Sequence, residues 1–264
     1  MGSDFVTPLS AIDRVAPTKR PNDHVIMYQR WACLLFLHWE VPVATLRPLV
    51  PEPLEIDTFD GRAFVGLVPF TMTGIRPRFL PAVRWLSDFH EVNVRTYVHV
   101  QGQGPGVFFF SLDAAQPVSA RLGRWFFRLP YRVARMRLNE RTKRGGEMSD
   151  GWMTYSSVRT SLGPKPAGCE IRYRPSGAPQ PAALGTLEHF LAERYLLYTG
   201  TRERLDREAV HHVPYPLQTA ELAEVRENLL AAAGIQRGDT PPLAHFARAV
   251  EVEVFPLRRL RFGT

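Results

Sequence analysis

The sequence predicts a mostly β (α+β) fold, with a large antiparallel sheet and a few peripheral helices. Many short segments rich in Val, Phe, Tyr and Thr lie between turns that contain Gly or Pro. Residues 89–100 alternate between apolar and polar side chains throughout. Helical periodicity is confined to a few segments. A barrel or a pair of packed, curved sheets would close such a sheet, and the pattern does not choose between them.

Strands are predicted where β-branched and aromatic residues run between turn signals. Asp60-Gly61 marks a hairpin before one of them, and the glycine-rich residues 101–106 mark another. A loop is expected at 74–88 and a Pro-rich loop at 175–181. The predicted strands cover residues 31–39, 62–72, 89–100, 107–113, 132–139, 153–160, 169–174 and 250–255.

Three helices are predicted from caps and apolar stripes. The first covers residues 44–49 and is closed by the prolines that follow. The second runs over 186–198, with Thr186 as its N-cap. The third runs over 219–233 and ends at Gly234. We expect residues 1–22 to form a polar tail and residues 23–264 to form a single domain, because neither a repeat nor a linker divides them.

The charge excludes little by itself. The formal net charge is +7, but lysine occurs only at Lys19, Lys143 and Lys165, and the remaining basic residues are arginines spread along the chain. This spread argues against a nucleic-acid partner. Without a secretion signal or an apolar run of membrane-spanning length, we expect a cytoplasmic protein with no membrane partner. Homo-oligomerisation is left open. Without a metal-type His or Cys cluster, we expect no metal and no cofactor.

The strand at 89–100 carries the main candidate site. One face holds Glu91, Asn93, Arg95, Tyr97 and His99, and the other holds valines and a threonine. Two arrangements are open. The polar face could look at solvent, which alternation by itself favours, or it could line an enclosed pocket.

Several ordered motifs resemble the DUF2071 (YqjF-like) family. The motifs span about residues 30 to 260. They include Phe36-Leu-His-Trp-Glu-Val-Pro-Val43, Gly61-Arg-Ala-Phe-Val-Gly-Leu-Val-Pro-Phe70, Phe89-His-Glu-Val-Asn-Val-Arg-Thr-Tyr97, Leu129-Pro-Tyr131 and Phe190-Leu-Ala-Glu-Arg-Tyr-Leu-Leu-Tyr198. That family is similar in turn to acetoacetate decarboxylase, which implies a barrel-like cone around a small-acid pocket.

The resemblance also implies a departure in chemistry. Acetoacetate decarboxylase forms a Schiff base through a lysine beside a second cation. In this sequence Tyr131 stands at the position of the reactive lysine and Arg132 at that of its neighbour. Neither side chain forms an imine with a ketone, so Schiff-base decarboxylation is not expected.

Candidate roles follow for the residues near this position. Glu91, raised in pKa by burial, and Tyr131, lowered in pKa by Arg132, could act as acid or base. Arg95, Arg132, Asn93 and Tyr97 are the predicted substrate-binding residues. Glu193 and Arg194 on the helix at 186–198 are predicted to support the pocket, although a surface ion pair is the simpler interpretation.

Three functions therefore stay open. The chain could bind a keto-acid-like molecule and act as a lyase or isomerase without an imine. It could use the same pocket to bind or sense a ligand without catalysis. Least favoured is a basic protein that binds nucleic acid.

Overall fold

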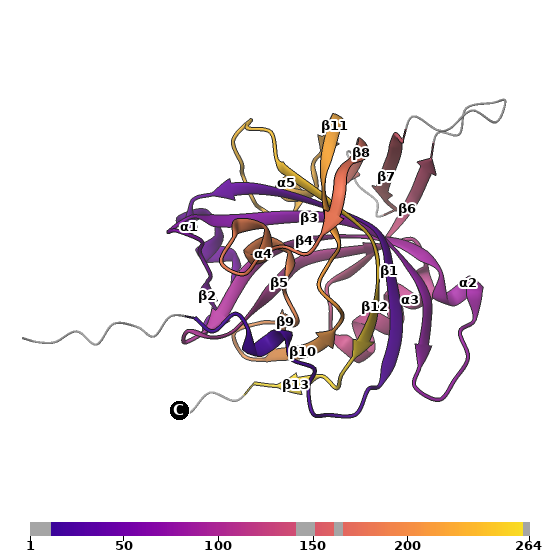
Figure 1. Cartoon of the computed structure of the whole chain (residues 1–264). Coiled ribbons are helices and arrows are strands. Elements are labelled where there is room, and N and C mark those ends of the chain that lie inside the picture. The colour runs from indigo at the N-terminus through magenta and orange to yellow at the C-terminus, as the bar shows by residue number, and fades with distance from the viewer. Residues whose placement is uncertain (1–11, 141–150, 161–165, 261–264) are drawn as a thin grey trace, which may run out of the picture.

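A computed structural model describes residues 12–140, 151–160 and 166–260. Within these ranges the strands form one curved sheet of thirteen, accompanied by short helices (Figure 1). The predicted fold class is confirmed. The strands are β1 (Met27–Val41), β2 (Glu55–Ile56), β3 (Ala63–Pro77), β4 (Phe89–Val100), β5 (Gln103–Ala114), β6 (Tyr131–Glu140), β7 (Met153–Arg159), β8 (Gly168–Gln180), β9 (Leu196–Gly200), β10 (Leu205–His211), β11 (Leu217–Glu227), β12 (Leu243–Val254) and β13 (Arg258–Arg259).

The helices are short and peripheral. None of those described is long and apolar enough to cross a membrane. They are η1 (Ala16–Thr18), α1 (Val43–Leu46), η2 (Arg47–Leu49), α2 (Arg84–Ser87), α3 (Pro117–Leu122), the π-helical η3 (Gly123–Phe127), α4 (Leu187–Ala192) and α5 (Leu229–Ala232).

Strand pairing closes the sheet on itself in two rings. The first, here the cavity ring, runs through β1, β3, β4, β5, β9, β10 and back through β12. The second, the packed ring, leaves β5 through β6, β7, β8 and β11 and returns to β12. Both rings share β12, β1, β3, β4 and β5. These shared strands therefore have an interior on each face, which ordinary antiparallel sheets lack.

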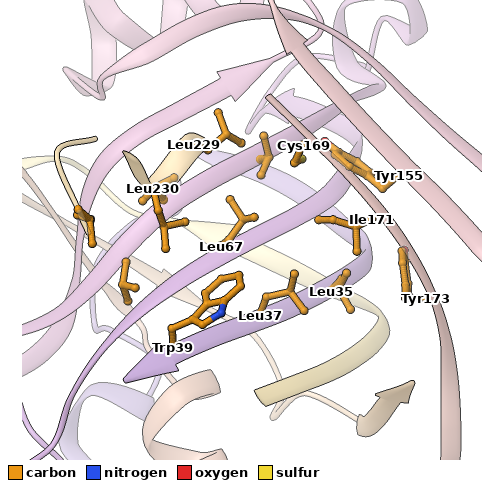
Figure 2. Close-up of a cluster of buried hydrophobic side chains, with 14 of the residues drawn as sticks. Leu35, Leu37, Trp39, Leu67, Tyr155, Cys169, Ile171, Tyr173, Leu229 and Leu230 are labelled. Atoms are coloured by element: carbon orange, nitrogen blue, oxygen red, sulfur yellow. The ribbon is translucent and has the colours of Figure 1, made fainter. Parts of the chain in front are cut away.

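The packed ring is filled by apolar side chains. Leu35, Leu37 and Trp39 of β1 meet Ile171 of β8, and α5 closes the cluster (Figure 2). The even-numbered Leu34 and Phe36 face the other ring. Cys33 has a left-handed φ of 51° between the two parts of β1, where the register against β3 shifts. This irregularity exchanges the faces, so odd-numbered Trp31 and even-numbered Leu34 line the same cavity.

Most of the predicted strands are present near their expected bounds. β4 spans exactly the predicted residues, and Gln101 and Gly102 form its left-handed turn into β5. The Asp60-Gly61 turn, the Thr186 cap and the end at Gly234 are also confirmed.

The helix predicted at 219–233 is wrong over most of its length. Residues 217–227 form β11, and α5 is confined to 229–232. Ala, Glu and Leu favour a helix by only a few tenths of a kcal/mol per residue. Pairing with β8 and β12 outweighs that preference, and Leu222 packs into the core while Thr219 and Glu221 face outward.

Two other boundaries also differ from the predictions. The expected Pro-rich loop at 175–181 belongs largely to β8, which continues to Gln180 along β11. Pairing with β7 ends at Tyr173, so Pro175 needs no donor on that side. The helix predicted over 186–198 ends at Ala192, because Leu196 begins a strand that pairs with β5 and β10.

Candidate functional site

The cavity ring encloses a space of about 580 Å³. Each of its strands contributes to the wall, and α2, α3 and η3 lie beside it. Leu122 and Phe126, 38% and 57% exposed, touch both the cavity and solvent, and we call these two residues the opening. A largely apolar cavity of this size with a few polar groups has the character of a small-molecule site.

The polar face of β4 lies inside this ring. Glu91, Asn93 and Arg95 are 1%, 5% and 8% exposed, and all three line the cavity. The solvent-facing arrangement favoured by alternation is therefore wrong. The opposite face of β4 is buried as well, because Val92 and Val94 lie in the core of the packed ring.

Glu91 and Tyr131 form a direct pair. The Tyr131 hydroxyl donates to Oε2 of Glu91 at 2.8 Å. Burial raises the pKa of Glu91 to about 8, against the opposing effect of this hydrogen bond and with a contribution from Asp113. The Tyr131 ring lies against Gly123, where a Cβ atom would come within 2.5 Å of it. A glycine in η3 therefore fixes where the phenol stands.

Tyr131 does not have the lowered pKa expected from Arg132. Burial, followed by Glu91 and then Glu208, raises the pKa of Tyr131 well above its usual value, so it stays a neutral donor. Adjacent residues of a strand point to opposite faces, and Arg132 is exposed while Tyr131 turns inward. Arg132 does not line the cavity with Glu91.

Glu208 is a cavity carboxyl that the sequence did not reveal. It lies on β10, is 5% exposed, and its Oε1 atom has no hydrogen-bond partner among the described residues. Burial raises its pKa to about 8. Its influence on Tyr131 places it near the Glu91–Tyr131 pair. The only sequence signal was an acidic residue in the short Leu-Asp-Arg-Glu-Ala-Val segment, which the predicted elements left unassigned.

Arg95 is buried without an ionic partner among the described residues. One terminal nitrogen donates to the Leu191 carbonyl at 3.2 Å, and Nε has no partner. Its guanidinium lies 5.6 Å from the centre of the Phe36 ring. Asn93 similarly leaves its Oδ1 atom unpartnered. Both residues line the cavity, and buried polar groups of this kind normally have a hydrogen-bond partner.

Tyr97 lies past the polar groups and outside the cavity wall. Its hydroxyl donates to the Leu191 carbonyl at 2.7 Å and lies 2.6 Å from Nε2 of His38. The structure therefore gives Tyr97 a place in the core rather than beside a ligand.

Glu193 and Arg194 lie in the connection between α4 and β9, not on a helix, and both are buried. They do not pair with each other, so the surface ion pair is wrong. Tyr195 and the Tyr215 amide hold Glu193. Arg194 lines the cavity and donates to Oδ2 of Asp57 at 2.8 Å.

Asp57 also pairs with Arg14, which lies before the first strand in the chain. Arg14, within the predicted tail, binds both of its oxygens at 2.6 and 2.8 Å. Burial alone would raise the pKa of Asp57, but Arg14 and Arg194 together hold it below its usual value.

Among the residues that the structure describes, no lysine lines the cavity and no metal-type cluster is present. Lys19 is exposed, and Lys143 and Lys165 lie outside the described residues. No group of three or more His, Cys, Asp or Glu side chains in residues 12–140, 151–160 and 166–260 is placed to hold a metal.

Comparison with known proteins shows the family. Residues 28–251 match the model of DUF2071, described as an uncharacterized conserved protein, and the chain belongs to this family. It is 41% identical over 240 residues to the uncharacterized protein YqjF of Bacillus subtilis (strain 168), which covers 90% of this chain and 94% of that protein.

The fold is that of the acetoacetate decarboxylase-like proteins. An acetoacetate decarboxylase-like enzyme from Sphingomonas wittichii RW1 superposes with a TM-score of 0.60 at 12% identity, covering 98% and 99% of the two chains. The enduracididine biosynthesis enzyme MppR, complexed with the condensation product of pyruvate and imidazole 4-carboxaldehyde, gives 0.61 at 12% identity over 89% and 90%. Acetoacetate decarboxylase from Legionella pneumophila gives 0.60 at 12% over 97% of each.

The raised pKa of Glu208 predicts a pH-dependent gain in stability for Glu208→Gln. Between its ordinary pKa of 4.5 and its folded value of about 8, the unfolded chain releases a proton that the folded chain keeps. This lowers the free energy of unfolding by up to about 1.4 kcal/mol for each pH unit in that window. In urea titrations at pH 5 and pH 8, the variant should therefore gain on the wild type as pH rises. Exposed Glu251→Gln is the control, and parallel pH profiles for wild type and Glu208→Gln would contradict the assignment.

The Asp57 pairings predict a large loss for Asp57→Asn. Removing this carboxylate leaves the buried Arg194 without its charged partner, and breaking a buried pair in this way costs about 3–5 kcal/mol. Arg14→Ala removes the more exposed cation and leaves Arg194 paired, so it should cost only about 0–1 kcal/mol. Urea unfolding measures both, and equal losses would show that Arg194 does not depend on Asp57.

Proposed function

We propose that this chain binds a small keto-acid-like molecule in the cavity and catalyses proton transfer on it without an imine. The observation that carries the proposal is the grouping of Glu91, Tyr131 and Glu208 on one cavity that also holds the unpaired Arg95. Membership in the acetoacetate decarboxylase-like fold supports a small-acid ligand by analogy.

Charge complementarity favours an anionic ligand. With pKa values of about 8, Glu91 and Glu208 are mostly neutral at pH 7, so neither cancels the charge of Arg95. A ligand carboxylate would give the guanidinium the charged partner it lacks, in a bidentate geometry that arginine suits. Asn93 would then lie between the bound carboxylate and the Glu91–Tyr131 pair along β4.

The two carboxyls divide acid and base roles. Tyr131 donates to Glu91 and so favours its ionised form, which makes Glu91 the base that removes a proton from the carbon beside the ketone. Glu208, to which no residue in the described ranges donates, is the acid that protonates the ketone oxygen. The C–H bond breaks as the O–H and C=C bonds form, and the product is an enol. Both groups have pKa values near the working pH, where proton transfer is most efficient.

This arrangement favours isomerisation over decarboxylation. Tyr131 occupies the position that the motif assigns to the imine-forming lysine, so a covalent electron sink is missing there. Arg95 would stabilise a bound carboxylate in the ground state, which opposes loss of CO2. Keto–enol isomerisation or hydration–dehydration would use the same groups and would need neither an imine nor the loss of CO2.

A binding or sensing role is the second candidate, and the same tyrosine favours it. A cavity that has lost the reactive lysine can keep its ligand affinity without any turnover. Ligand binding is common to both candidates, whereas proton exchange is specific to the first.

Ligand binding is expected to depend on Arg95. A 2-oxo or 3-oxo acid at a hundredfold excess over its Kd should raise the stability of the wild type by roughly 2.7 kcal/mol. Arg95→Met, which keeps the bulk and removes the charge, should abolish this shift in thermal melts. Arg132→Met, an exposed arginine on the outer face of β6, should retain it. An absence of any shift in a cooperatively melting wild type would refute the small-acid site.

Turnover is expected to depend on Glu91. In D2O, NMR should show that the wild type exchanges the protons beside the ketone of a bound acid. The exchange rate should rise through a pKa of about 8 as Glu91 ionises. Glu91→Gln should bind the acid yet lose at least about a hundredfold in rate, the typical contribution of a general base. Binding by the wild type without exchange at any pH would establish the non-catalytic role instead.

A further inference from the structure

The cavity is larger than a four-carbon keto acid requires. Its volume of about 580 Å³ equals the share of roughly 19 liquid waters. A four-carbon keto acid has seven heavy atoms and would leave most of this space unfilled. The polar groups described above account for one part of the wall, and most of the remainder is apolar, which favours contact with an apolar occupant.

The polar and apolar parts follow one another along β4. Arg95, Asn93, Glu91 and Phe89 line the cavity in that order, over about 20 Å of strand. Phe89 lies opposite Met72 in the register of β3 and β4. Leu86 of α2 precedes Phe89 in the chain and also lines the cavity. The wall therefore changes from a cation, through the carboxyl, to apolar side chains.

The apolar wall continues to the opening. Leu122 and Phe126 line the cavity and also reach solvent. α3 is joined to α2 by Ser119, whose hydroxyl donates to the Leu86 carbonyl at 2.9 Å. Trp85 of α2 and Trp125 of η3, which directly follows α3, are 68% and 75% exposed. A chain that leaves the cavity here would stay in contact with apolar side chains rather than with water alone.

We propose that the ligand is an amphiphile, a keto acid with a linear acyl chain. Its carboxylate pairs with Arg95, its ketone lies at Glu91 and Tyr131, and its chain runs past Phe89 towards the opening. This assignment rests on the proposed function and adds the class of substrate to it. Two features carry it together, the order of polar and apolar groups along β4 and the exposed Leu122 of α3, a helix that Ser119 joins to Leu86.

The test is a series of 2-oxo and 3-oxo acids of four, six, eight and ten carbons, titrated by calorimetry below their micellar concentrations. Burial of each methylene should tighten Kd about fourfold, so each two-carbon step should tighten it about fifteenfold until the chain reaches the opening. Arg95→Met should weaken every member of the series.

Two variants on α3 distinguish binding in the acyl channel from non-specific hydrophobic binding. Leu122→Asp places a charge where the chain passes, so it should weaken binding of the eight- and ten-carbon acids far more than binding of the four-carbon acid. Val118→Asp, 46% exposed on the same helix and outside the cavity wall, should leave all values unchanged. Both positions are exposed, so neither charge disturbs the core.

Each of the other outcomes contradicts a different part of the proposal. Equal affinity across the series, or loss of affinity with length, would leave a small-acid site and refute the acyl chain. A chain-length gain that survives Leu122→Asp would refute the channel at the opening. An absence of binding at every length would refute the proposed function itself, and the acyl inference with it.

Discussion

The structure depends on one constraint, the sharing of β12, β1, β3, β4 and β5 between two closed rings of strands. Where a strand has an interior on each side, both of its faces are buried, so side chains there fill a core or line a cavity. One ring is filled by apolar packing, and the other keeps an open space of about 580 Å³. The shared strands therefore carry apolar side chains of the packed core on one face and the polar groups of the cavity on the other.

Burial explains the electrostatics of the site. Water would solvate Glu91 and Glu208 and keep them ionised, but the enclosed wall raises the pKa of each to about 8. Arg95 lies on the same wall and forms no ion pair with a described residue. The same low-dielectric space thus disfavours the charged form of both carboxyls. Arg194 differs because Asp57 pairs with it, which assigns that residue to holding the wall together rather than to the ligand.

Sequence reasoning succeeded where local chemistry decides. The bounds of β4, the Asp60-Gly61 turn and the Thr186 cap follow from side-chain period and turn stereochemistry, which act over a few residues. The resemblance of its motifs led to the family and fold, and it named Glu91 and Tyr131 as separate candidates, which the structure joins by a 2.8 Å hydrogen bond. Sequence reasoning failed at β11, where helix-forming residues pair as a strand. It also failed at Arg132, which is exposed while its neighbour Tyr131 faces the cavity.

By itself the sequence determined that this is a mostly β chain of its family, with a tyrosine at the lysine position and a polar face on one strand. Tertiary structure alone decided that the polar face is buried, that Glu208 joins it from β10, and that Asp57 and Arg14 hold Arg194. The physical reason is range. Alternation tells which side chains share a face, but whether that face meets water depends on strands far away in the chain, and only their pairing encloses it.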